Sequence, residues 1–170
     1  VLFRSYILDY KTEVEIYKSS FGEQIEQYFL PQVLENFAKI IVSSRLEKES
    51  PTIKKWLGNL DKYKQFTDRD GLLLKLDIYT GKLPTWLSEE DTKKFDKSIR
   101  KDILTESEKE GQRGISGRQS LSIINSFILK FADEDNLITL ENIREFFVNN
   151  RNIYGNEIPA SFILSLIDLY

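Results

Sequence analysis

The sequence has no cysteine, no histidine and no methionine among its 170 residues. Without cysteine it can form no disulfide, thiolate nucleophile or cysteine-ligated zinc site, which fits a cytoplasmic protein. Without histidine it can form no Ser-His-Asp triad and no imidazole metal site, so only carboxylates remain for metal binding or acid–base chemistry. The absence of methionine, and so of an initiator, leads us to expect an excised piece of a longer protein.

Nucleotide-binding and kinase signatures are also missing from the sequence. A P-loop needs G-x-x-x-x-G-K-[ST] so that backbone amides, Lys and Ser or Thr can hold phosphate and Mg²⁺. The Gly81-Lys82 pair in "YTGKLPT" lacks both the earlier glycine and the hydroxyl residue after the lysine. The kinase motifs H-R-D, D-F-G and G-x-G-x-x-G are absent as well. We therefore assign no catalytic residue and no metal site, and expect the chain alone to be inactive and to bind ATP weakly or not at all.

The charge balance argues against nucleic acids and membranes as partners. The net charge is -3 and the pI is near 5.2, whereas binding to nucleic acid or an anionic membrane needs clustered positive charge. No apolar run reaches the roughly 18 residues of a membrane span. One basic cluster, Lys93 to Lys101, alternates with acidic residues and is typical of a solvated, ion-paired helix face.

Apolar residues recur with a helical period along most of the chain, which predicts an all-α fold. Thr12 with Glu15 suggests a capping box for a first helix, and Ser50-Pro51 opens another helix that Gly58 closes. Ser88 is expected to cap one long helix over 89–110, ended by Gly111. Alternation in residues 1–8 allows a short strand remnant at the N-terminus.

The stretch "GQRGISGRQSL" joins this long helix to an apolar one. Ser116 and Gln119 fit an S-x-x-Q capping box, which predicts that the second helix begins at Gly117. Gly114 and Gly117 are expected to let the backbone turn or approach another segment closely.

Arg118 is the unusual residue of this stretch. In the first turn of a helix a cation opposes the helix dipole by about 0.3–1 kcal/mol unless an anion is present. Its spacing from Leu121 predicts that it projects from the end of the buried face rather than from the open surface, where it could reach a nucleotide phosphate. The alternative is that Arg118 pairs with an acid of the preceding helix or faces water.

Two resemblances bear on that choice. "SGRQSLSIINSFI", followed after a charged gap by "ITLENIREFF", resembles the lid of AAA+ ATPases, in which an arginine at the start of a lid helix contacts ATP as the sensor-2 residue. More specifically, "YILDYKTEVEIY", "FLPQVLENFAKIIVSSRL", "LLLKLDIYTG", "PTWLSEED", "EGQRGISGRQS" and "IPASFILSLIDLY" resemble the PrkA family of bacterial serine protein kinases.

The PrkA resemblance implies a full-length parent that binds ATP and Mg²⁺ through an upstream AAA+ core and acts on a protein substrate. This chain would then be the lid and adjoining C-terminal segment, with Arg118, or Arg113 as the fallback, touching nucleotide. We expect residues 1–50 to hold the end of the core and the first lid helices, 51–110 a helical insertion or connector, 111–150 the lid helices, and 151–170 the start of the next region. A homo-oligomer is possible. The alternative function is a helical regulatory or protein-interaction module with no nucleotide role.

Overall fold

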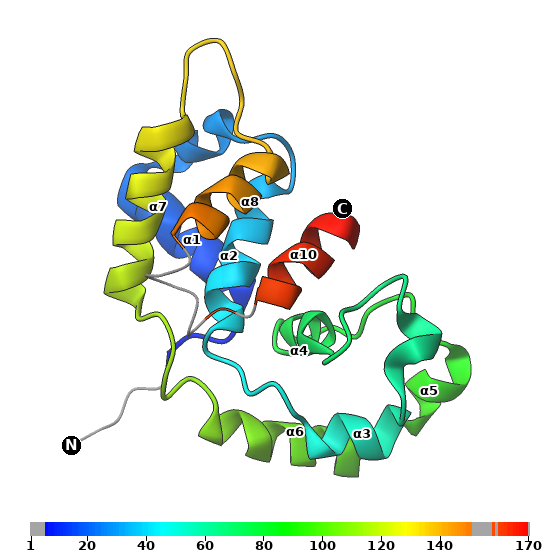
Figure 1. The fold of residues 1–170 in the computed structure, drawn as a ribbon. Helices are drawn as coiled ribbons and strands as arrows, with labels where there is room; N and C mark the ends of the chain where they lie inside the picture. The colour runs from blue at the N-terminus through cyan, green and yellow to red at the C-terminus, as the bar shows by residue number, and fades with distance from the viewer. Residues whose placement is uncertain (1–5, 151–157, 159, 170) are drawn as a thin grey trace, which may run out of the picture.

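The computed structural model describes residues 6–150, 158 and 160–169, which form helices joined by loops (Figure 1). In these ranges the only β pairing is an isolated parallel bridge between Phe29 and Ile138, and the predicted all-α fold is confirmed. Residues 1–5 of the expected strand remnant lie outside the described residues, and residues 6–8 form no strand. The elements are α1 (Tyr10–Phe21), η1 (Glu23–Tyr28), α2 (Val33–Ser43), α3 (Pro51–Leu57), η2 (Leu60–Tyr63), α4 (Leu72–Ile78), α5 (Glu89–Lys94), α6 (Lys97–Lys109), α7 (Gly117–Phe131), α8 (Leu140–Asn149) and α10 (Ala160–Leu169).

Most of the predicted helix ends are confirmed, but the predicted start of α1 is wrong. Ser50 caps α3 by accepting a hydrogen bond from the Ile53 amide at 3.2 Å, and Gly58 follows its last residue. The first helix, however, begins earlier than the Thr12–Glu15 pattern predicts. The Asp9 carboxylate accepts from the backbone amides of Lys11 and Thr12, so Asp9 is the N-cap and Thr12 lies inside the helix.

The single helix expected over 89–110 is wrong, because the chain breaks between α5 and α6. The Asp96 carboxylate accepts a hydrogen bond from the Ile99 amide at 2.9 Å and caps a new helix. Phe95 leaves the helical conformation, and its ring packs 4.9 Å from that of Trp56. An Asp side chain that bonds nearby backbone amides competes with the helix, and here the cap prevails over the helical pattern.

Helices α1, α2, α7, α8 and α10, with η1, form what we call the main bundle (Figure 1). Helix α2 lies at its centre and packs against α1, α4, α8 and α10, which explains why nearly all of its side chains are buried. Aromatic rings fill the core: Phe37 stacks 5.0 Å from Phe127 and lies 5.7 Å from Phe147.

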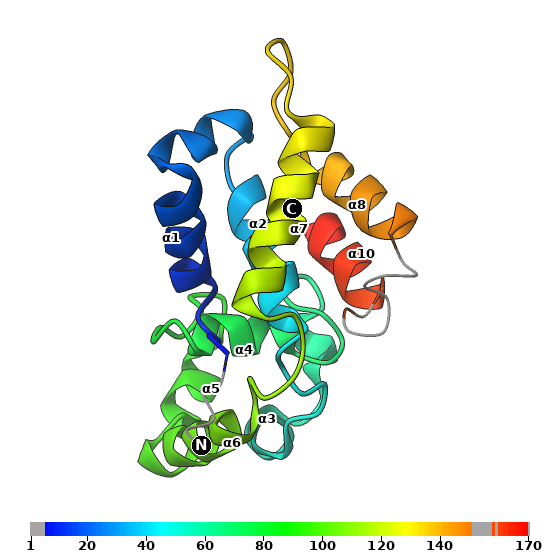
Figure 2. The same ribbon diagram turned by 90° about the vertical axis from the view of Figure 1, so that its left-hand side faces the viewer.

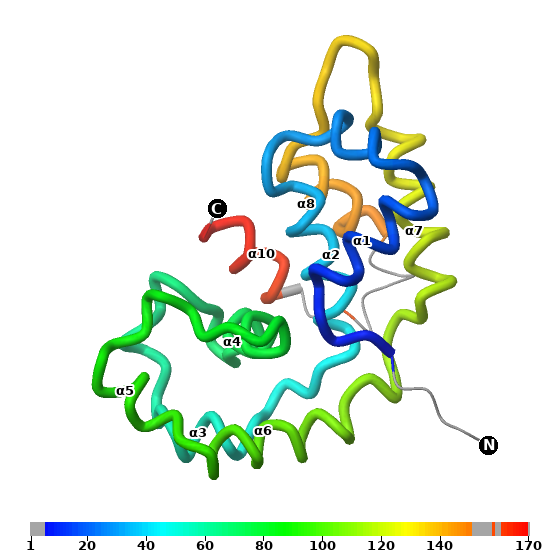
Figure 3. The backbone as a smooth tube through the Cα atoms, turned by 180° about the vertical axis from the view of Figure 1, so that it is seen from behind, coloured from blue at the N-terminus to red at the C-terminus, as the bar shows by residue number. Residues whose placement is uncertain are grey.

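The segment from α3 to α6 forms a second, smaller core, which we call the α3–α6 unit. Figures 2 and 3 show this unit at one end of the molecule, with α4 next to the main bundle. Leu72, Leu73 and Leu76 of α4 pack into the main bundle, whereas Leu74 packs into the smaller core. The chain therefore leaves the main bundle after α2, builds the α3–α6 unit, and returns at α7.

Candidate functional site

The return path from α6 to α7, residues 110–118, contains both arginines predicted to contact nucleotide, and we call it the junction. Gly111 and Gly114 have positive φ angles of 75° and 96°. A Cβ built on Gly114 would lie 2.3 Å from the Ser44 carbonyl oxygen, so the predicted close approach is confirmed there. It is wrong for Gly117, which is helical and has no heavy atom within 4 Å of its Cβ position. The predicted capping box of Ser116 and Gln119 is confirmed.

A buried arginine just after α2 forms a hydrogen bond with the backbone of the junction. Arg45 is 1% exposed, and its Nε donates to the Ile115 carbonyl at 2.8 Å. Its other two nitrogens donate to the Glu13 carboxylate at 3.0 and 3.3 Å, and one of them also reaches the Ile7 carbonyl. A buried charge is tolerated when it is paired and hydrogen-bonded. Here the bonds join the junction, α1 and Ile7 to the residue that follows the C-cap of α2.

The Arg45–Glu13 pair continues into the first turns of α7. The Ser120 hydroxyl donates to the Glu13 carboxylate and lies 3.1 Å from the Tyr17 hydroxyl. Burial, followed by the charge of Glu13, raises the pKa of Tyr17 well above its ordinary value, so this phenol stays neutral. Hydrogen bonds of Ser120 with Glu13 and Tyr17 thus connect the start of α7 to α1.

A second buried network fixes the other end of the junction. Lys75 of α4 donates to the Glu110 carboxylate and to the Glu47 carbonyl, each at 2.9 Å. Glu110 also accepts from the Glu47 amide at 2.9 Å and from the Tyr79 hydroxyl at 2.6 Å. Burial and the neighbouring Glu110 charge raise the pKa of Tyr79, so it remains a hydrogen-bond donor. Neither Arg45 nor this Lys75–Glu110 pair was identified from the sequence, because nothing in the local pattern distinguishes them from surface charges.

The two arginines predicted to contact nucleotide, Arg113 and Arg118, have different environments on the junction. Arg113 forms an ion pair with Glu47 at 2.7 Å, although both side chains are largely exposed, at 68% and 49%. Arg118 is exposed in the first turn of α7, and no described residue forms a hydrogen bond or ion pair with it. The expectation that Arg118 projects from the buried face is therefore wrong. The structure places both side chains on the same segment but gives them no mutual contact.

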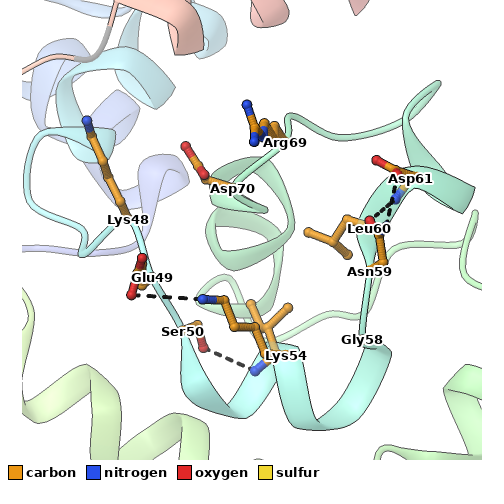
Figure 4. Close-up of a pocket in the computed structure, with 11 residues that line it drawn as sticks. Lys48, Glu49, Ser50, Lys54, Gly58, Asn59, Leu60, Asp61, Arg69 and Asp70 are labelled. Atoms are coloured by element: carbon orange, nitrogen blue, oxygen red, sulfur yellow. Dashed lines mark hydrogen bonds and ion pairs between the residues drawn. The ribbon is translucent and has the colours of Figure 1, made fainter.

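A pocket of about 320 Å³ lies beside α3, and sequence reasoning did not anticipate it (Figure 4). Its lining comes from three separate segments, 48–54, 58–61 and 69–70, so no local motif marks it. Three basic and three acidic residues line it: Lys48, Lys54, Arg69, Glu49, Asp61 and Asp70. Because these charges balance, the pocket has no evident preference for an anion or a cation. Among the residues that the structure describes, no group of acidic side chains is arranged to hold a metal ion.

The fold and the junction define an all-helical domain in which two packed units are joined by a segment that carries two arginines and is hydrogen-bonded to its neighbours. Residues 73–161, slightly more than half of the chain, match the family model for the PrkA serine protein kinase C-terminal domain. The chain therefore belongs to the PrkA serine protein kinase family. No curated protein and no solved structure matches it. Within the described ranges, no helix is both long and apolar enough to cross a membrane.

Proposed function

We propose that this chain is the lid and C-terminal segment of an ATP-dependent serine protein kinase of the PrkA type. In this proposal it helps to close over a nucleotide bound by an upstream AAA+ core. Family membership supports the kinase parent. The single observation that carries the nucleotide role is the presentation of Arg118, which is exposed and unpaired among the described residues while buried networks fix the backbone around it.

The chemistry of Arg118 favours a phosphate as its partner. A guanidinium remains charged at any physiological pH and presents a rigid fork of donors that matches phosphate oxygens. In the first turn of α7 it adds to the positive end of the helix dipole, so an anion there would relieve an unfavourable contact. ATP and Mg²⁺ would be held mainly by the core, and this chain would add the arginine contact.

Arg113 is the fallback residue for this role. To reach a phosphate it must leave Glu47, but an exposed ion pair of this kind contributes only about 0–1 kcal/mol. The pairing therefore disfavours Arg113 relative to Arg118 by a modest amount and does not remove it from consideration.

The test is ATP turnover and protein phosphorylation by the full-length parent. We expect Arg118→Ala to lower kcat by roughly 10²–10³, as the loss of one charge-stabilising donor typically does. Its free energy of unfolding should change by about 0.5 kcal/mol or less, as for other surface substitutions. Arg144→Ala on α8, which removes another exposed arginine, is the matched control and should leave activity normal.

Arg113→Ala, measured in parallel, decides between the two candidates. Normal activity in Arg118→Ala with impaired activity in Arg113→Ala would move the role to Arg113. Normal activity in both variants would contradict the nucleotide contact.

A regulatory or protein-interaction module is the second candidate function. The observation that favours it is that the matching family model is that of a C-terminal domain, and its range includes both Arg113 and Arg118. If this function holds, variants of the junction leave ATP turnover unchanged in the full-length protein. Substitutions on the outer surface of the chain should then alter phosphorylation of the protein substrate.

A further inference from the structure

A groove of about 560 Å³ lies between the C-terminal end of α4, the turn that follows it, and the face of α6. Apart from Gly81, its lining combines an apolar floor with two basic side chains, and no carboxylate of the described residues lines it. The apolar residues are Ile78, Tyr79, Leu83, Phe95, Ile103 and Leu104, and the basic ones are Lys82 and Arg100.

The floor of this groove leaves apolar surface open to solvent. Leu104 is 57% exposed, although it follows directly after the buried Ile103 on α6. An exposed leucine alone is common, but here it adjoins the half-buried rings of Tyr79 and Phe95 in one concave surface. Contiguous apolar surface with a polar rim is typical of a protein-binding site.

The two basic residues have no acidic partner in the described ranges, which gives the groove its charge preference. Lys82 and Arg100 are exposed, and neither forms an ion pair with a described residue. The Arg100 guanidinium lies over the Phe95 ring, 5.7 Å from its centroid, which holds this cation near the rim. Glu106, one acid of the same helix, is bonded instead to Ser50 and Thr52 of α3.

We propose that this groove is a docking site for an acidic amphipathic segment of a protein partner. Apolar anchors of such a segment would cover Leu104 and the floor, and its carboxylates would meet Lys82 and Arg100. The commitment to an acidic partner rests on this charge complementarity, because the described residues that line the groove include two cations and no acid. The site is independent of any nucleotide role of the junction.

A second groove offers a built-in comparison. It measures about 330 Å³ and is lined by apolar and uncharged polar residues of α1, η1 and α7 and their ends, including Tyr28, Ile128 and Leu129. Leu129 is 77% exposed, more than Leu104, yet the part of the chain that the structure describes places no charged side chain in this lining. A partner attracted only by exposed apolar surface would choose this second groove at least as readily.

The experiment measures binding of two labelled synthetic peptides to the chain by fluorescence anisotropy. Both carry leucine at positions i, i+3, i+4 and i+7 of a helix, with glutamate in one peptide and lysine in the other between the leucines. We expect the glutamate peptide to bind at least about 10-fold more tightly, with an advantage that shrinks as salt is added. The double variant K82E/R100E should reverse the preference, which no loss of folding could do.

Leu104→Ser should weaken binding of the glutamate peptide by about 10-fold, whereas Leu129→Ser is the matched control and should leave it unchanged. Equal binding of the two peptides, no binding of either, or loss of binding only in Leu129→Ser would overturn the proposal. Analytical ultracentrifugation of the chain without peptide tests whether the groove instead binds a second copy of the chain. If the chain self-associates and Leu104→Ser abolishes this, the occupant is a second copy and the partner proposal is wrong.

Discussion

The main bundle and the α3–α6 unit are held together by different means. In the main bundle, helices of 10–15 residues surround an aromatic core. In the α3–α6 unit, three of the four α-helices have only 6 or 7 residues. Helices that short are marginal in isolation, so they depend on tertiary contacts.

In the α3–α6 unit, hydrogen bonds at the helix ends supply many of these tertiary contacts. Asp91 accepts from Lys62 at 2.8 Å and from the Tyr63 hydroxyl, while the Asp91 carbonyl accepts from Trp56 Nε1 at 2.8 Å. Glu106 joins α6 to the start of α3 in the same way. The main bundle should therefore lose stability when its buried ion pair loses one partner. The α3–α6 unit should respond to protonation of its carboxylates.

The largest effect is expected where the main bundle buries its ion pair. Arg45→Met leaves the Glu13 carboxylate buried without its partner, so we expect a loss of about 3–5 kcal/mol in the free energy of unfolding. Urea unfolding followed by circular dichroism measures it. The double variant R45M/E13L removes both charges and should recover most of the loss. A loss below about 1 kcal/mol in Arg45→Met would show that the bundle does not depend on this pair.

Sequence reasoning predicted the helices better than the contacts between them. The capping box at Ser116 and the close approach at Gly114 follow from short local patterns, because turn and cap chemistry is local. The burial of Arg45 could not be predicted, since its partners Glu13 and Ile115 are 32 and 70 residues away in the sequence. The break at Asp96 was also missed, because the apolar spacing of α5 and α6 continues across it. The exposure of Arg118 was predicted incorrectly from helix geometry alone.

A second, smaller effect is expected at the junction between the two units. Gly114→Ala places a Cβ against the Ser44 carbonyl at a positive φ angle, so we expect a loss of about 1–3 kcal/mol. Gly117→Ala is the matched control, because that position is helical and open, and it should leave stability unchanged or raise it by up to about 1 kcal/mol. Equal effects of the two substitutions would mean that the junction is not held as closely to Ser44 as the structure shows.

The smallest effect concerns the pH response of the α3–α6 unit. Burial alone would raise the pKa of Glu106, but hydrogen bonds from Ser50 and Thr52 outweigh it and lower the pKa below its ordinary value. The pKa of Asp91 is lowered in the same sense, where bonds from Lys62 and Tyr63 outweigh the opposing effect of burial. A carboxylate with a depressed folded-state pKa stabilises the fold above its unfolded pKa of about 4, and this stabilisation is lost as the pH falls through the folded value.

Acid should therefore loosen the α3–α6 unit before the main bundle, and the chain carries natural probes for this comparison. Both of its tryptophans, Trp56 and Trp86, pack in or against the smaller core, so their fluorescence reports on that unit, while circular dichroism reports on all helices. As the pH is lowered from about 5 to about 3, we expect the fluorescence transition to occur at higher pH than the dichroism transition.

The variant Glu106→Gln tests the contribution of one of these carboxylates. Its free energy of unfolding should be about 1 kcal/mol lower than that of the unsubstituted chain at pH 7. This difference should shrink as the pH falls, because protonation then removes the same charge from the unsubstituted chain. Glu141→Gln on α8, whose carboxylate is 69% exposed, is the control and should shift neither transition. Coincident transitions in the unsubstituted chain would show that the two units unfold together. In that case the hydrogen bonds of Glu106 and Asp91 would not make the α3–α6 unit more sensitive to acid than the main bundle.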